Sequence, residues 1–286
     1  MGILNNILAA VDSSVVADEV LKRAIFLAKK ENAQITVLHS IDIPLFDKPF
    51  GNVDDEEKIK NKIVQKMDAL NAEAKVDYFV TVTRGNPSDK IVYEANRLQS
   101  DLIIIGAHGR QSIKDTFFGS TAHNVTQKSH LPVLIVKTPA EHDYKEILAL
   151  TDLSEASQKN IRFAQELFED ATINVSYAYQ QMSDMSVDFY NLESERELYR
   201  EELRKQVEQD VEAFQKSLSL DNTEVIEGFD SVREMLLETA KKQKCDLVLL
   251  GAHGIKVSDT VLYGSTASFL MKAVPSDVLI YVPLEK

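Results

Sequence analysis

The residues best suited to chemistry are small and polar, and they occur in two copies. Gly106-Ala-His-Gly109 is followed, after nine residues, by Gly119-Ser120-Thr121. The same pattern, Gly-x2-Gly-x9-Gly-Ser-Thr, returns at Gly251, Gly254, Gly264, Ser265 and Thr266. Glycine lets backbone N–H groups approach a ligand without an obstructing Cβ. The Ser-Thr pair would open a helix, whose free N–H groups and positive dipole end attract phosphate. The pattern predicts a site for a di- or triphosphate.

A plainer explanation competes with the phosphate site. A turn followed by a helix cap accounts equally well for a single Gly-x-x-Gly after an apolar strand. The duplication favours a ligand, because both copies keep the same internal spacing and each follows its first strand at a similar distance. The sequence offers no other nucleotide motif, since it has neither a Gly-x4-Gly-Lys-[Ser/Thr] loop nor a Gly-x-Gly-x-x-Gly fingerprint.

An aspartate ends the first apolar segment ahead of each copy. Asp12 closes ILAAVD and is followed by Ser14, and Asp152 closes ILALTD and is followed by Ser154. Both carboxylates would lie at the carboxyl end of a strand, beside the same crevice, where they can meet a base or a ribose. Asp-x-Ser is equally typical of a helix cap, and the two roles are compatible.

These motifs belong to two similar halves of about 140 residues each, because the aspartate segments lie 140 residues apart and the glycine motifs 145. In each half, apolar strands alternate with amphipathic helices. The order βαβαβαβαβ predicts a doubly wound α/β domain with a mostly parallel five-stranded sheet and helices on both faces. We predict domains over residues 1–138 and 144–286, joined by a polar linker that contains Pro139.

The periodicity of apolar residues places the individual elements. Strands are predicted at 7–11, 34–41, 76–82, 101–105, 133–136, 147–151, 173–179, 224–227, 246–250 and 278–282. Helices are predicted to follow Ser14, then at 55–74, 88–98, 121–129, 154–168, 193–217 and 231–243, and after the second glycine motif. The helices at 55–74 and 193–217 mix charges of both signs, which favours solvated faces over a docking surface.

Composition excludes several classes of protein. The 286 residues are 44% hydrophobic and 27% charged, typical of a globular protein. The net charge of −13 repels polyanions, so we expect no nucleic-acid binding. No apolar run approaches the roughly eighteen residues of a membrane helix, and the first residues lack the basic segment and cleavage site of a signal peptide. We expect no membrane association and a cytoplasmic protein.

Other reactive side chains show no catalytic pattern. The single cysteine, Cys245, precedes an apolar run, which favours a buried thiol over a nucleophile. His108 and His253 lie inside the glycine motifs without a nucleophile–base pair or carboxylate cluster nearby in the sequence. The remaining histidines, His39, His123, His130 and His142, lack metal-ligand spacing. We therefore expect neither a catalytic residue nor a metal site of the protein's own.

With these motifs the chain resembles the universal stress proteins, in the tandem form with two such domains. The resemblance covers nearly the whole chain, and both copies of the family's ATP-binding motif, G-x2-G-x9-G-[ST], are complete. It implies an adenine-nucleotide α-hydrolase-like fold that binds ATP, ADP or AMP, with Mg²⁺ entering alongside the nucleotide. Adenine would lie near Asp12 and Ile41. The nucleotide-binding set would be Gly106, His108, Gly109, Arg110, Gly119, Ser120 and Thr121, with Asp152, Tyr179, Gly251, His253, Gly254, Gly264, Ser265 and Thr266 in the second half.

The two copies differ at two positions. Arg110 follows the second glycine of the first copy and could reach a phosphate, whereas Ile255 stands there in the second. Tyr179 replaces Ile41 and would either stack on adenine or block the pocket. The first half is therefore the better candidate for a nucleotide site.

The resemblance implies a regulatory or protective binding protein of the stress response rather than an enzyme. An enzyme of the same superfamily that cleaves ATP at the α-phosphate would need an S-G-G-x-D-S or H-I-G-H motif, and the sequence has neither; weak ATP hydrolysis stays open. So does a nucleotide-free interaction scaffold, or a protein that binds another small ligand, with one or both pockets vestigial. The resemblance also implies that the last strands of the halves pair, giving an intramolecular pseudo-dimer that could dimerise again.

Overall fold

The computed structural model describes residues 2–12, 14, 16–42, 53–107, 118–181, 196–251, 254–257 and 260–281. The chain forms two compact units. The first unit comprises residues 1–143 together with 254–262 and 277–286, and the second comprises 144–253 and 263–276. The first unit thus contains two segments that belong to the second half by sequence. The domain boundaries at 138 and 144, which follow the sequence repeat, stay a prediction.

The sheet of the first unit has the predicted mostly parallel order. Its strands are β1 (Asn6–Ala10), β2 (Gln34–Ile41), β3 (Tyr78–Arg84), β4 (Leu102–Gly106) and β5 (Val133–Val136). They pair in parallel in the order β3-β2-β1-β4-β5. β12 (Asp277–Tyr281) pairs antiparallel with β5. The last strand of the sequence therefore completes the sheet of the first unit.

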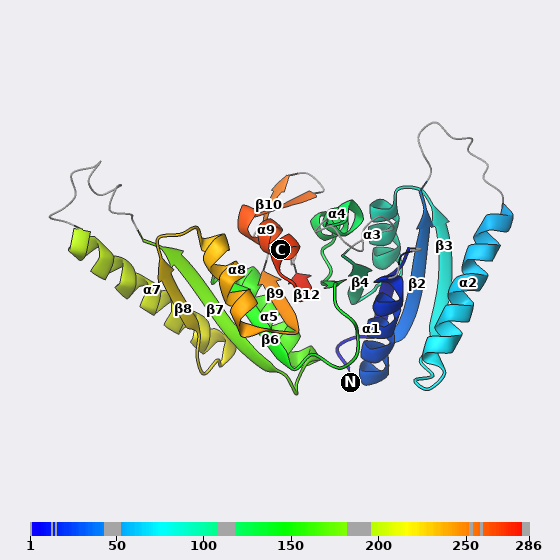
Figure 1. Cartoon of the computed structure of the whole chain (residues 1–286), viewed down its shortest axis with the longest axis horizontal. Coiled ribbons are helices and arrows are strands. Elements are labelled where there is room, and N and C mark those ends of the chain that lie inside the picture. Colours follow the sequence, from blue (N-terminus) through cyan, green and yellow to red (C-terminus); the bar gives the residue numbers. More distant parts are fainter. Residues whose placement is uncertain are drawn as a thin grey trace. The chain divides into compact units, whose positions relative to one another are not determined.

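Helices flank this sheet in two pairs. α1 (Val16–Glu31) contacts α2 (Val53–Asn71), and α3 (Pro87–Arg97) contacts α4 (Ser120–Lys128). Figure 1 shows α2 running alongside β3. Four consecutive residues of both β1 and β4 are buried, as expected of parallel strands covered on both faces.

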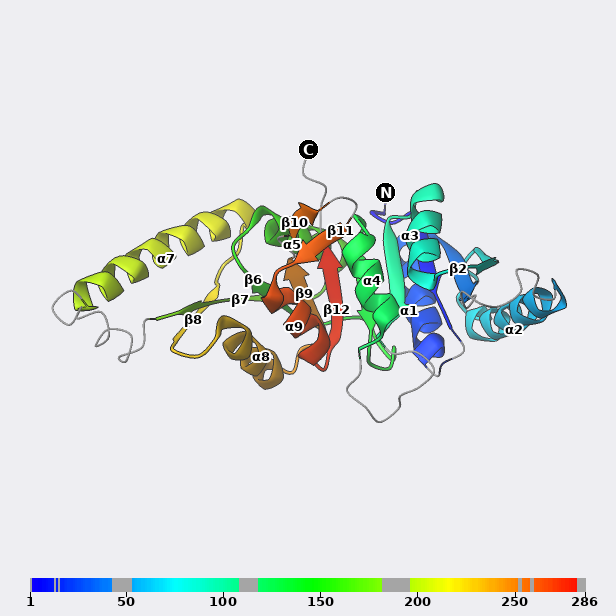
Figure 2. The ribbon, with the colours of Figure 1, turned by 90° about the horizontal axis from the view of Figure 1, so that it is seen from above.

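The second unit repeats this arrangement. Its strands are β6 (Glu146–Thr151), β7 (Thr172–Gln180), β8 (Glu224–Gly228) and β9 (Leu247–Gly251), paired in parallel in the order β9-β6-β7-β8. Its helices are α5 (Glu155–Leu167), α7 (Arg196–Leu218), α8 (Val232–Gln243) and α9 (Ser265–Ala273). Figure 2 shows β7 and β8 between α7 on one side and α8 on the other. The doubly wound fold is confirmed, and none of the described helices is long and apolar enough to cross a membrane.

One pair of strands was not predicted. β10 (Gly254–Val257) and β11 (Thr260–Tyr263) form a separate two-stranded sheet within the second glycine motif. The sequence pattern predicts only the loop of the motif there. The segment carries Ile255, Val257 and Val261, which favour extended backbone.

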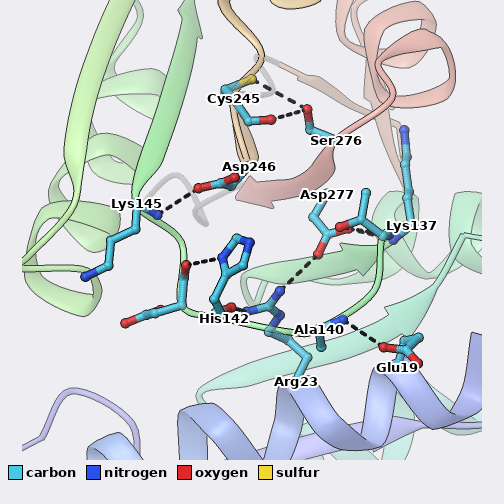
Figure 3. Close-up of polar contacts among 12 residues, drawn as sticks. Glu19, Arg23, Lys137, Ala140, His142, Lys145, Cys245, Asp246, Ser276 and Asp277 are labelled. Atoms are coloured by element: carbon cyan, nitrogen blue, oxygen red, sulfur yellow. Dashed lines mark hydrogen bonds and ion pairs between the residues drawn. The ribbon is translucent and has the colours of Figure 1, made fainter.

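A buried carboxylate anchors β12 in the first unit. Asp277 is fully buried, and its Oδ1 accepts hydrogen bonds from Lys137 N at 2.7 Å, Thr138 N at 2.9 Å and Thr138 Oγ1 at 2.9 Å (Figure 3). Its Oδ2 lies 3.9 Å from Nη2 of Arg23, which is also buried. Arg23 Nη1 donates to the carbonyl oxygen of His142 at 2.8 Å. One cluster therefore joins β12, the end of β5, α1 and the linker.

Helix α1 holds the linker at further points. Glu19 Oε2 accepts a hydrogen bond from Ala140 N at 2.7 Å, as Figure 3 shows, and Lys30 forms an ion pair of 3.2 Å with Asp143. The polar composition of the linker is thus explained by contacts with one helix rather than by exposure to solvent alone.

Candidate functional site

In the first unit the structure gathers the predicted site residues at the carboxyl edge of the sheet. Asp12 follows β1 and Gly106 ends β4, and these strands are neighbours, with Ala10 opposite Ile105. Gly119 N donates to the carbonyl oxygen of Ala107 at 2.8 Å, which holds the start of α4 beside the end of β4. Parts of the motif that lie thirteen residues apart in the sequence therefore meet at the edge where parallel sheets bind ligands.

The amino terminus of α4 has no side-chain cap among the described residues. Gly119 is its N-cap residue, with φ −65° and ψ 138°. The Ser120 side chain is exposed and Thr121 is half-buried. α9 starts in the same way at Gly264, with Ser265 exposed. The first N–H groups of a helix have no partner within it, so they and the adjacent hydroxyls are available to a phosphate.

The glycines at the strand ends have a structural function that the sequence did not reveal. A Cβ on Gly106 would lie 2.9 Å from Val16 Cγ1 of α1. A Cβ on Gly251 would overlap Ser157 Oγ and would lie 2.6 Å from Ser157 Cα in α5. These glycines allow a helix to pack closely on the end of a strand, whether or not a ligand is bound.

The two aspartates close local turns. Asp12 Oδ1 accepts a hydrogen bond from Ser14 N at 2.8 Å, and Asp152 Oδ1 accepts one from Ser154 N at 3.0 Å. Both form Asx turns ahead of a helix, and in α5 the N-cap residue itself is Ser154. Because Asp12 and Asp152 are exposed, contact with a base or ribose is compatible with this geometry and stays a prediction.

A histidine missed as a site residue lies beside the first aspartate. His39 is buried in β2, and its Nδ1 lies 2.9 Å from the carbonyl oxygen of Val11. A carbonyl oxygen only accepts, so Nδ1 carries the hydrogen of this bond. The bond joins the ends of β1 and β2. The sequence signal was a histidine two positions before Ile41, in the same strand.

The position of Ile41 is equivalent to that of Tyr179 in the sheets. Ile41 of β2 lies opposite Arg84 of β3, and Tyr179 of β7 lies opposite Glu227 of β8. Arg84 forms an ion pair with Glu56 of α2, whereas Glu227 forms one with Arg204 of α7. The strand-to-helix ion pair is present in both halves, but its polarity is reversed.

Part of each predicted site lies outside the described residues, namely His108, Gly109, Arg110 and His253. Gly254 lies in β10, in the segment that belongs to the first unit, whereas Gly251 and Gly264 belong to the second. The structure therefore brings Asp12, Ile41, Gly106, Gly119, Ser120 and Thr121 into one unit. The second glycine motif is divided between the units, because Gly254 belongs to the first and Gly251 and Gly264 to the second.

Comparison with known protein families matches both halves of the chain. The model of the universal stress protein family matches residues 4–137 and again residues 143–282. This chain belongs to the universal stress protein family. It carries the family's domain twice in tandem, as the internal repeat predicted.

Individual relatives match either one half or the whole chain. The stress response protein NhaX of Bacillus subtilis is 30% identical over 163 residues, which is 46% of this chain and 98% of NhaX. The crystal structure of the functionally unknown protein PA1789 of Pseudomonas aeruginosa has a TM-score of 0.72 at 17% identity, covering 98% of this chain and 93% of PA1789. A universal stress protein of Archaeoglobus fulgidus has a TM-score of 0.65 at 18% identity, covering 97% of this chain and 98% of that protein. These structures confirm the fold.

Proposed function

We propose that this universal stress protein binds an adenine nucleotide, ATP, ADP or AMP, in its first half and acts as a regulatory or protective binding protein. The observation that carries the proposal is the amino terminus of α4, which no side chain of the described residues caps and which the bond from Gly119 to Ala107 holds beside the end of β4. The choice of adenine rests on the family resemblance of the motif. Contact of the base with Asp12 and Ile41 belongs to the same proposal.

Local groups have to overcome the charge of the whole protein. The net charge of −13 repels a polyphosphate at long range. Backbone N–H groups at the start of α4 and the hydroxyls of Ser120 and Thr121 are neutral donors that act only at short range. Mg²⁺ bound to the phosphates would reduce the repulsion further, and the metal would be held mainly by phosphate oxygens and water.

The test is direct measurement of bound nucleotide. We expect ATP to give binding heat on titration, and AMP to bind at least about tenfold more weakly, because it lacks the phosphates that the helix terminus would hold. Freshly purified protein should also release adenine nucleotide on heat denaturation. Absence of both the binding heat and the released nucleotide would reject the proposal. Phosphate release during the same titration would reveal weak hydrolysis.

A further inference from the structure

The second half has a tyrosine in the place that Ile41 occupies in the first. Tyr179 is 8% exposed and packs with Val207 and Val211 of α7. Figure 2 shows α7 running along β7 and β8, so that this helix covers the end of the strand that carries Tyr179. The ring of Tyr177 stacks beside that of Tyr179, with 6.4 Å between centroids. The tyrosine ring is thus part of the core of the second unit.

Hydrogen bonds fix the polar end of this ring. Tyr179 OH donates to Glu227 Oε2 at 2.7 Å. Arg204 holds the same carboxylate at both oxygens, from Nε at 2.9 Å and from Nη2 at 2.8 Å. Gln181 Nε2 donates to Glu227 Oε1 at 3.0 Å. A bidentate Arg–carboxylate pair is geometrically specific, and together with packing against Val207 and Val211 it holds the ring in this position.

Leu153 adds a further apolar contact to this cluster. It follows Asp152 directly, adopts a left-handed backbone conformation with φ 62°, and packs against the cluster of Tyr179, Val207 and Val211. A leucine in this conformation costs roughly 1–2 kcal/mol. Such a residue persists only where its surroundings compensate, and here the compensation is the apolar contact with the cluster.

The first half has different residue types at these positions. Ile41 is half-buried, lacks a polar end and lies beside an arginine rather than a glutamate. The residue after Asp12 is Ser13, where the second half has Leu153. Both replacements in the second half are larger than their counterparts, and Leu153 is also more apolar than Ser13.

We propose that Tyr179 and Leu153 together occupy the place in the second half that corresponds to the adenine position beside Asp12 and Ile41. The chain would then bind a single nucleotide, in its first half. This inference rests on the proposed function, which places adenine beside Asp12 and Ile41. On this inference the second half has a structural role, and Tyr179 is the residue that excludes the nucleotide from it.

The first experiment locates the bound nucleotide by equilibrium dialysis with ATP. We expect one equivalent on the wild-type protein and none on Ser120→Glu. The new carboxylate repels phosphate, but an acidic residue in the first turn suits the helix dipole and should preserve the fold. Gln127→Glu adds the same charge near the other end of α4 and should still bind one equivalent.

The alternative outcomes separate this inference from the proposed function. Two equivalents on the wild type, or one equivalent retained by Ser120→Glu, would overturn the inference while leaving adenine-nucleotide binding in place. No binding to the wild type at all would remove the proposed function and the inference with it.

The second experiment removes the two side chains proposed to exclude adenine from the second half. The double variant Tyr179→Ile, Leu153→Ser gives the second half the residue types of the first, and we expect it to bind two equivalents of ATP. Tyr179→Phe keeps the ring and should bind one. A double variant that melts cooperatively and still binds one equivalent would show that these side chains do not exclude the nucleotide.

Discussion

At the scale of the residue, Gly251 and Gly264 belong to one motif but have different surroundings. A Cβ on Gly251 would lie 2.6 Å from Ser157 Cα and 2.7 Å from Ser157 N in α5, whereas no atom of the described residues lies within 4 Å of a Cβ on Gly264. We expect Gly251→Ala to lower the free energy of unfolding by about 2–3 kcal/mol through overpacking, and Gly264→Ala by less than about 1 kcal/mol. Denaturant titrations of both variants measure the difference. Equal losses in the free energy of unfolding for the two variants would mean that α5 can move away from the new Cβ at little cost.

Glu227 gives the second unit a dependence on pH. Its hydrogen bonds from Arg204 and Tyr179 lower its pKa from 4.5 to about 2, although partial burial opposes the shift. A lowered carboxyl pKa stabilises the fold above pH 4.5, and this stabilisation is lost as the pH falls toward 2. We expect the free energy of unfolding of the wild type to drop by about 1–2 kcal/mol more than that of Glu227→Gln over this range. Parallel curves for the two proteins would contradict this role.

The sequence predicted single residues well where the physical cause was local. The turn at Asp12 and Ser14 follows from two neighbouring residues, and so does the turn at Asp152 and Ser154. The orientation of the Tyr179 side chain depends on Glu227 and Arg204, which are 48 and 25 residues away in the sequence. The sequence alone therefore left open whether this ring stacks on adenine or blocks the pocket. Tertiary contacts decide such cases.

At the scale of the element, Asp277 determines how β12 is held. Asp277→Ala would leave Lys137 N and Thr138 without this acceptor, and Arg23 without its buried ion pair. We expect a loss of about 3–5 kcal/mol in the free energy of unfolding. Asp277→Asn keeps an oxygen acceptor and should lose about 1–2 kcal/mol.

The matched control for Asp277 is an exposed ion pair. Lys242 and Glu238 lie 3.7 Å apart on α8, and both side chains are more than 70% exposed. Lys242→Ala should change the free energy of unfolding by less than about 0.5 kcal/mol. If Asp277→Ala changed it no more than this control, the buried cluster would contribute nothing to stability.

Periodicity located the elements to within two or three residues, because burial of one face imposes it directly. The strand at 34–41 was predicted with its observed bounds, and the helix predicted at 193–217 is α7, Arg196–Leu218. The sheet of β10 and β11 was missed, since two strands of four residues are too short for a clear alternation. The contacts of Asp277 were not predicted for a different reason, since its hydrogen-bond partner Lys137 lies 140 residues away in the sequence.

At the scale of the whole molecule, the first unit depends on residues from the end of the sequence. β12 supplies β5 with its antiparallel partner and brings Asp277 to the linker, although it belongs to the second half of the repeat. The unit that carries the candidate nucleotide site is therefore not contained within residues 1–138. The intramolecular pseudo-dimer and a further homodimer stay predictions.

A chain shortened after Ser276 tests this dependence, with a chain shortened after Tyr281, which keeps β12, as its control. We expect hydrogen exchange in peptides covering 133–143 to become about tenfold faster in the shorter chain, equivalent to about 1.4 kcal/mol of local stability. β5 would keep its parallel partner β4 but lose its antiparallel partner β12, and the amides of Lys137 and Thr138 would lose Asp277. Peptides covering β7 serve as the internal reference. Unchanged exchange at 133–143 would mean that β5 is stable as the edge of a sheet of the first half alone.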